Sequence, residues 1–187
     1  MFDATRKRIA AHMRRLMQVR LARRFVRQQD GAAAVEFALV AAPFLALTFA
    51  ILETAMVFFA GQTLEAAVAD SARLIMTGQA DSQGLTQNTF KSAVCARIYG
   101  LFDCANGMYV DVKTYNNFGA ISNAVTYDGT GKPITTYQPG NPGDIVVVRL
   151  IYQWPITIPL VRSFLADPSA NTRMLVATAA FRNEPYK

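Results

Sequence analysis

The longest apolar run of the chain extends from Phe37 to Phe59, and Glu53 is its only charged residue. A helix of these 23 residues would be about 34 Å long, at about 1.5 Å per residue, and a hydrocarbon core is roughly 30 Å thick. Pro43 does not argue against a span, because membrane helices tolerate proline. The pattern therefore predicts a transmembrane helix over residues 32–61.

Helical periodicity continues beyond this run. Four residues of the continuation share one face, namely Leu64, Val68, Ser71 and Ile75. No residue breaks the pattern before Gly78, so we predict one helix from about Ala32 to Thr77. Its first half would lie in lipid, and its second half, residues 62–78, would be an amphipathic continuation outside the membrane.

The rest of the chain, residues 79–187, has the pattern of a small α+β domain. Apolar positions recur at helical spacing over 86–101, which predicts a second helix capped by Thr86 or Asn88. Three runs of β-type residues follow, at 108–115, 144–154 and 173–181. The middle run is apolar on nearly both faces and predicts the central strand of an antiparallel sheet of three or four strands.

Two finer features concern the first strand and the segment after it. In the first run, valines alternate with Asp111 and Lys113, which predicts that one face of this strand is wet. The next 28 residues, 116–143, are rich in Gly, Asn, Thr and Pro. This is long for a plain connection, so we expect part of it to form a hairpin around residues 128–132.

Positive charge is concentrated before the span. Residues 1–30 contain nine Lys or Arg and two Asp, although the whole chain carries a net charge of only +6. The positive-inside rule predicts that residues 1–31 are a cytoplasmic leader, that the chain crosses the inner membrane once, and that residues 79–187 are periplasmic. Since the basic residues adjoin a span, inner membrane lipid is their expected partner and nucleic acid is not.

The sequence offers no constellation of catalytic residues. Its only histidine, His12, lies within 9–26, which has the spacing of a basic amphipathic helix, and we expect it to be solvated. Ser-His and Cys-His arrangements are therefore missing beyond the span, and the carboxylates show no pairing suited to acid and base roles. A membrane-anchored hydrolase would need such residues. We expect no enzyme activity and no cofactor.

Cys95 and Cys104 are the only cysteines, and the predicted topology places both in the periplasm. In an oxidising compartment a disulfide between them is the expected state. Two cysteines alone cannot build a structural zinc site, so no metal is expected. A reactive thiol pair is the remaining alternative.

Glu36 stands at the start of the apolar run, where a carboxylate needs a physical reason. Ionisable residues inside a membrane are costly and are by default functional candidates with a partner to be named. The alternative is that Glu36 lies just outside the hydrocarbon core and favours the positive N-terminus of its own helix. Position alone does not decide between these two interpretations.

The processing site of type IV prepilins of the Flp/Tad class is similar to residues 31–37, which read GAAAVEF. In that family a membrane aspartic peptidase cuts after the glycine, and the fifth and sixth mature residues are Glu and Tyr or Phe, as Glu36 and Phe37 are here. The longer run from Gly31 to Arg73 resembles the TadE-like minor pseudopilins. An arginine expected shortly after the second glutamate of this run is missing. The ending, residues 178–186, also resembles members of this family.

This resemblance implies a pilin-like fold and a minor pseudopilin that acts in initiation or assembly of a Flp-type pilus, and so in adhesion. It implies a cut between Gly31 and Ala32 by prepilin peptidase. Other pilin-like subunits, TadF- or TadG-like proteins and the major Flp pilin, are then the expected partners.

The cut would create a charged amine at Ala32. A neighbouring subunit's Glu36, with Phe37 beside it, would neutralise that amine and set the register between subunits. Glu53 would be a second intramembrane carboxylate. The alternative function is an uncleaved single-span protein whose periplasmic domain binds a partner or an envelope component.

Overall fold

The structure is a computed structural model that describes residues 31–98, 100–122, 124–167 and 171–186. Residues 1–30 of the predicted leader, including the amphipathic helix at 9–26 and His12, lie outside the described residues. The chain divides into two compact units, Met1–Thr48 and Phe49–Lys187. The long helix α2 contributes residues to both units.

Helix α2 extends from Ala32 to Met76 and has Pro43 inside it. At about 1.5 Å per residue, its 45 residues make a helix of about 68 Å. The sequence predicted this helix to within one residue. It ends because Gly78 adopts a φ of 73°, and the amide of Gly78 donates to the carbonyl of Ile75 at 3.0 Å.

In the first unit, α2 exposes its large apolar side chains. The exposed ones are Val35, Phe37, Leu39, Val40, Phe44, Leu45 and Leu47. Among the described residues, α2 is the one helix that is long and apolar enough to cross a membrane, and its most apolar window has no buried residue. An apolar surface of this extent is unusual in a protein that meets only water. The helix therefore fits a single-pass membrane protein.

The second unit contains one antiparallel sheet in the order β1-β2-β3. The three strands are β1 (Met108–Tyr115), β2 (Ile145–Pro155) and β3 (Thr172–Arg182). Each lies within about one residue of its predicted bounds, and the most apolar strand is central, as predicted. The α+β fold class is confirmed.

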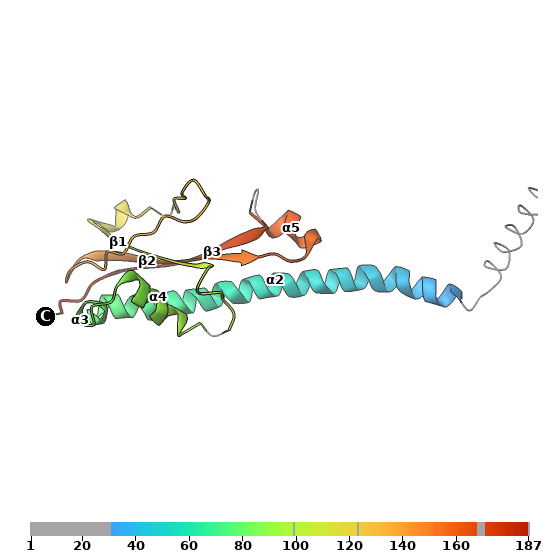
Figure 1. Ribbon diagram of the computed structural model, residues 1–187, viewed down its shortest axis with the longest axis horizontal. Helices are drawn as coiled ribbons and strands as arrows, with labels where there is room; N and C mark the ends of the chain where they lie inside the picture. Colours follow the sequence, from blue (N-terminus) through green and yellow to red (C-terminus); the bar gives the residue numbers. More distant parts are fainter. Residues whose placement is uncertain (1–30, 99, 123, 168–170, 187) are drawn as a thin grey trace, which may run out of the picture. The chain divides into compact units, whose positions relative to one another are not determined.

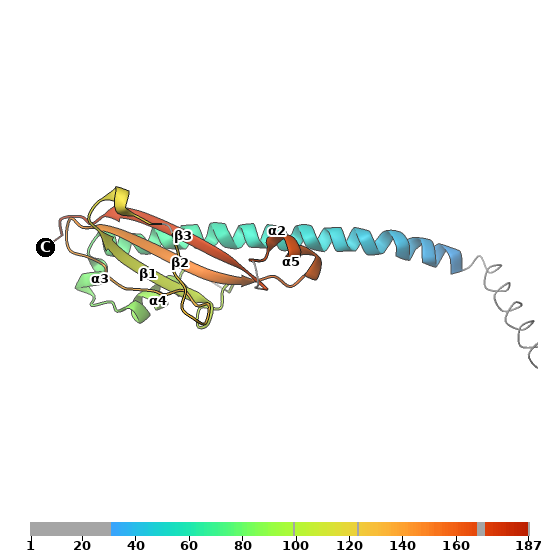
Figure 2. The same cartoon turned by 90° about the horizontal axis from the view of Figure 1, so that it is seen from above.

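Helices α2 and α4 (Gln87–Cys95) cover one face of this sheet (Figures 1 and 2). The core between them is mainly apolar and includes Leu64, Val68 and Ile75 from α2, Phe90 and Val94 from α4, and Val110, Val148 and Leu150 from the sheet. The stripe of α2 predicted from periodicity is therefore the face that the domain buries, Ser71 included.

Helix α4 is shorter than the predicted helix at 86–101. Thr86 is its N-cap: the Thr86 hydroxyl accepts from the amide of Thr89 at 3.3 Å, and the Thr86 amide donates to the Thr89 hydroxyl at 2.8 Å. After Cys95 the amides of Arg97 and Ile98 bond three residues back instead of four, so the chain tightens into a turn. Ile98 keeps the apolar spacing and is buried, which is why the pattern overestimated the helix.

The predicted wet face of β1 is wrong at Asp111, which is only 3% exposed. Segment 116–143 covers this side of the sheet, opposite α2 and α4 (Figure 1). Asp111 Oδ1 accepts from the amide of Thr136 at 2.8 Å, and Asp111 Oδ2 lies 3.7 Å from Nη1 of the facing Arg149, which is also 3% exposed. Arg149 Nη2 in turn donates to the carbonyl of Ser122.

Strand pairing explains why the alternation of polar and apolar residues in β1 led to the wrong prediction of a solvent-exposed Asp111. Asp111 and Arg149 are directly opposite in neighbouring strands, so each buries its charge against the other. Single-strand periodicity treats each charge as solvated because it has no information on the residue opposite.

The predicted hairpin around residues 128–132 is reduced to a turn with one bridge, Tyr127 to Pro133. The carboxylate of Asp128 fills this turn and accepts from the amides of Thr130 and Lys132. Further along, the chain pairs with the free edge of β1. The amide of Val112 donates to the carbonyl of Thr136, and the amide of Gln138 donates to the carbonyl of Val112. Segment 116–143 thereby covers both a face and an edge of the sheet.

Short helices that the sequence did not predict complete the domain. They are α3 (Gln79–Ser82), the 3-10 helix η2 (Phe118–Ala120) and α5 (Pro159–Leu165). The C-terminal segment closes the end of α2: the Glu184 amide donates to the carbonyl of Met76, and the Tyr186 ring lies against Gly78, where a Cβ would come within 2.4 Å of it.

We expect Asp111→Ala to reduce the free energy of unfolding by about 3 to 5 kcal/mol, because it leaves Arg149 buried without its counterion. Lys113→Ala is the matched control, since Lys113 also pairs with Asp111, at 3.4 Å, but its side chain is 30% exposed. Its loss should cost at most about 1 kcal/mol. Unfolding of the full chain in mild detergent, followed by circular dichroism, measures both. Equal losses would contradict the assigned role of the Asp111–Arg149 pair.

Candidate functional site

The predicted cleavage site lies at the beginning of α2. Gly31 is exposed and directly precedes Ala32, the first residue of the helix. Among the described residues, a Cβ at Gly31 would meet no atom within 4 Å, and Gly31 has no positive φ. Gly78 is the opposite case, with both a positive φ and a crowded Cβ position. The described part of the fold therefore requires glycine at 78 and shows no such requirement at 31.

Glu36 and Phe37 lie in the second turn of α2, and both side chains are exposed. Phe37 is 74% exposed. Within the part of the chain that the structure describes, Glu36 has no ion pair or side-chain hydrogen bond. The described residues therefore supply no polar partner for Glu36, which is predicted to set the register between subunits.

Glu53, the other carboxylate of the apolar run, is fully engaged within its own chain. Its Oε1 accepts from the Thr157 amide at 2.6 Å, the Thr157 hydroxyl at 2.7 Å and the Ile158 amide at 3.2 Å. Its Oε2 lies 3.2 Å from the Ile158 amide as well. Glu53 therefore fastens α2 to the connection between β2 and α5. That Glu53 is intramembrane stays a prediction.

A small apolar cluster forms next to this contact. Val57 of α2 packs with Ile156 and Val161, and all three are buried. Val57 is the first residue of α2 that the domain buries, one turn after Glu53. The polar contact and the apolar cluster together mark the level at which the domain begins along α2.

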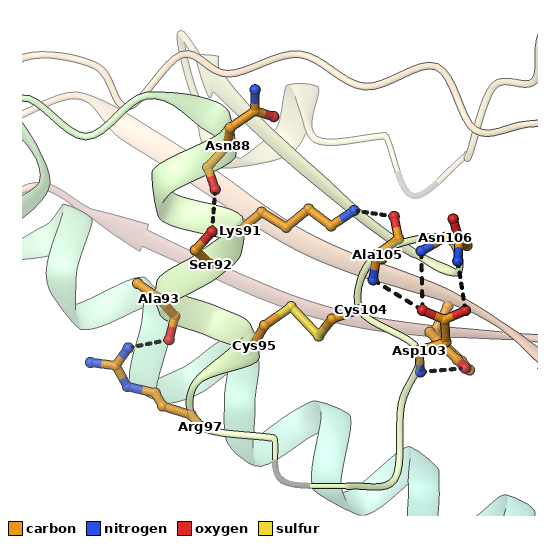
Figure 3. The surroundings of a disulfide bond; sticks show 11 residues. Asn88, Lys91, Ser92, Ala93, Cys95, Arg97, Asp103, Cys104, Ala105 and Asn106 are labelled. Atoms are coloured by element: carbon orange, nitrogen blue, oxygen red, sulfur yellow. Dashed lines mark hydrogen bonds between the residues drawn. A yellow bond between two sulfur atoms is a disulfide. The ribbon is translucent and has the colours of Figure 1, made fainter.

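The predicted disulfide is present between Cys95, the last residue of α4, and Cys104, with Cα atoms 6.0 Å apart (Figure 3). It closes the turn after α4 against the segment before β1. Asp103 orders the same turn (Figure 3): its carboxylate accepts from the side chain and amide of Asn106 and from the amide of Ala105. These bonds, led by the Asn106 side chain, hold the pKa of Asp103 below its ordinary value.

No group of three His, Cys, Asp or Glu side chains suited to a metal ion occurs among the described residues. The groups of interest therefore lie along α2 and at the disulfide. Gly31 directly precedes α2, and Ala32, Glu36 and Phe37 lie in the first two turns of α2. Glu53 is placed well apart from them, against the domain.

Sequence reasoning missed the partners of Glu53 and the helix α5 beside it. Pro159 at the first position of α5 is a recognised helix-start signal, and Leu160 and Phe164 have helical i,i+4 spacing. Seven residues are too few for periodicity to stand out. The Glu53 contact joins residues 104 positions apart, which no local pattern reveals.

These features define a class: an α+β protein with one N-terminal apolar helix suited to a single membrane crossing. Within that class, the model of a family described as TadE-like protein matches residues 31–73. The resemblance found in the sequence is thereby confirmed for this segment, which associates the chain with Flp/Tad pili. TadE-like pilus proteins are structural proteins and not enzymes. No curated protein and no solved structure matches the chain.

We expect the double variant Cys95→Ser, Cys104→Ser to lose about 2 to 3 kcal/mol of stability, because the bond constrains the unfolded chain over a separation of nine residues. Thermal unfolding in detergent measures the loss, and reduced, alkylated wild-type protein should show the same loss. Alkylation of unreduced protein from its native membrane, followed by intact-mass analysis, should label neither cysteine. Two labelled thiols there would contradict a periplasmic domain.

Proposed function

We propose that the chain is a minor pseudopilin of a Flp/Tad-type pilus. Its basic leader, residues 1–31, is cytoplasmic and is removed after Gly31 by prepilin peptidase. Residues 32–61 cross the inner membrane, residues 62–78 continue the helix, and residues 79–187 form the periplasmic domain. The mature protein acts in initiation or assembly of the pilus, by packing its helix against other pilin-like subunits, the major Flp pilin and TadF- or TadG-like proteins.

The observation that carries this proposal is where the family match begins. The TadE-like match starts at Gly31, and α2 starts at Ala32. The new N-terminus would therefore be the first residue of the helix, so that a cut there leaves α2 whole. Glycine at 31 has no role in the described fold, which fits a requirement imposed by another protein, the peptidase.

The two carboxylates of the apolar run support a division of roles. Glu53 has its hydrogen-bond acceptors filled by Thr157 and Ile158 of the same chain. Glu36 has no such partner among the described residues, and a lone charge near lipid is costly. The amine that cleavage creates at Ala32 of a neighbouring subunit has the charge to pair with Glu36. Such a pair would form only when helices of two subunits lie at one fixed stagger.

We expect Gly31→Leu to accumulate as the full-length chain, while the wild-type protein from its own cells begins at Ala32. N-terminal sequencing and intact mass measure the difference. Gly129→Leu is the matched control, because a Cβ at Gly129 also meets no atom within 4 Å and Gly129 has no positive φ. It should be processed normally. An N-terminus at Met1 in cells with active prepilin peptidase would favour the uncleaved, partner-binding alternative.

For Glu36 we expect Glu36→Ala and Glu36→Gln to be inserted and cleaved but not assembled. Both leave the neighbour's amine unpaired near lipid, and removing one member of a buried pair costs roughly 3 to 5 kcal/mol. A charge that only favours the end of its own helix would contribute about 1 kcal/mol or less. Co-purification with pilin partners and counts of surface pili measure assembly.

The control for this experiment is Asp70→Asn, which removes an exposed carboxylate from the same helix. It should assemble normally. Glu36→Gln keeps the shape of the side chain and loses only its charge, so it is the decisive variant. Normal pili in Glu36→Gln cells would contradict charge pairing and leave the family assignment untouched.

A further inference from the structure

We propose that helix α5 is a second membrane contact of this protein, with Leu160 and Phe164 inserted into the periplasmic leaflet beside α2. This inference rests on the membrane crossing of the proposed function and goes beyond it. The ligand is the lipid surface itself, at the boundary between headgroups and acyl chains. No part of the TadE-like match includes α5.

Helix α5 has an inner and an outer apolar face. Val161 is 5% exposed and packs with Val57 and Ile156, so the inner face holds α5 to α2. Phe164 is 80% exposed and Leu160 is 58% exposed, and their i,i+4 spacing puts them on the same side of the helix. A phenylalanine and a leucine in this state gain free energy from any apolar surface that covers them.

The contacts of α5 fix its level along α2. Glu53 binds the two residues directly before α5, Thr157 and Ile158. One groove is lined by residues of α2 from Thr54 to Glu65, by Phe164 and Leu165 of α5, and by Arg173 and Leu175 of β3. Phe164 therefore lies beside the end of the predicted span and the first turn of α2 beyond it.

Lipid is indicated as the covering partner because apolar exposure on α2 ends at this same level. Met56, Phe58 and Phe59 are 43%, 70% and 59% exposed. Between Phe59 and Phe118, no large hydrophobic side chain of the described residues is exposed. The exposed face of α5 is thus continuous with the end of the lipid-facing surface of α2. Interfacial helices bury their apolar face by about 5 to 10 Å, which two side chains on one helix turn can reach.

The test uses tryptophan as a depth probe. Trp154 is the only tryptophan, so Trp154→Phe gives a silent background for Phe164→Trp in the full chain. The protein is reconstituted into phosphatidylethanolamine–phosphatidylglycerol vesicles with and without brominated acyl chains, which quench nearby tryptophan. Phe44→Trp, within the span, is the positive control. Phe118→Trp, 56% exposed and next to the opposite end of the sheet, is the negative control.

We expect the Phe164 probe to be blue-shifted and to lose emission in brominated lipid, most with bromine near the headgroup end of the chain. The Phe118 probe should lose none. A quenched Phe44 probe with an unquenched Phe164 probe would overturn the proposal. A blue-shifted, unquenched Phe164 probe that depends on the protein-to-lipid ratio would also overturn it, because a second copy would then cover α5.

Two features of the experiment distinguish a failure of this proposal from a failure of the proposed function. An unquenched Phe44 probe would refute the membrane crossing itself, and the proposal with it. Cleavage and pilus assembly play no part in this measurement, so a failure of pilin processing leaves its outcome unaffected. If Trp154→Phe prevents folding, the same probes in the native background, with the wild-type emission subtracted, give the same comparison.

Discussion

The structure depends on one helix that meets two different environments. From Ala32 to Leu52 the large apolar side chains of α2 are exposed, and from Val57 onward one stripe of the same helix is buried in the domain. Burial therefore begins at a defined level of α2, between Leu52 and Val57. Glu53 and the Val57 cluster set that level. The sheet, α4 and the disulfide build on the buried stripe.

The two glutamates of the apolar run illustrate how the environment assigns roles to like residues. Glu53 is satisfied by two amides and a hydroxyl of its own domain, so it stabilises the attachment of α5 to α2. Glu36 has no ion pair or side-chain hydrogen bond among the described residues. The proposed register mechanism therefore involves Glu36 and not Glu53, and a change at Glu53 acts first on the fold.

The buried pair of Asp111 and Arg149 also attaches one part of the domain to another, on the face of the sheet opposite α2 and α4. It neutralises two charges between neighbouring strands, and through Thr136 and Ser122 it holds segment 116–143 against the sheet. These contacts hold segment 116–143, whose described residues form no regular strand or long helix, as a layer against the sheet. An apolar pair would fill the same space but would not form these hydrogen bonds. The two charged side chains therefore specify where segment 116–143 lies.

The sequence by itself determined the apolar helix and its end at Gly78, the positions of the three strands and the TadE-like segment, and it narrowed the cap of α4 to Thr86 or Asn88. Each of these depends on local spacing or on a short string of residues, which a single chain segment contains in full. Only the tertiary structure decided that Asp111 is buried, that helix α4 stops at Cys95, that Glu53 binds Thr157, and that α5 lies beside α2. These features depend on residues far apart in the chain, such as Asp111 and Arg149, and the free energy of burying a charge is decided by the group that folding places opposite it.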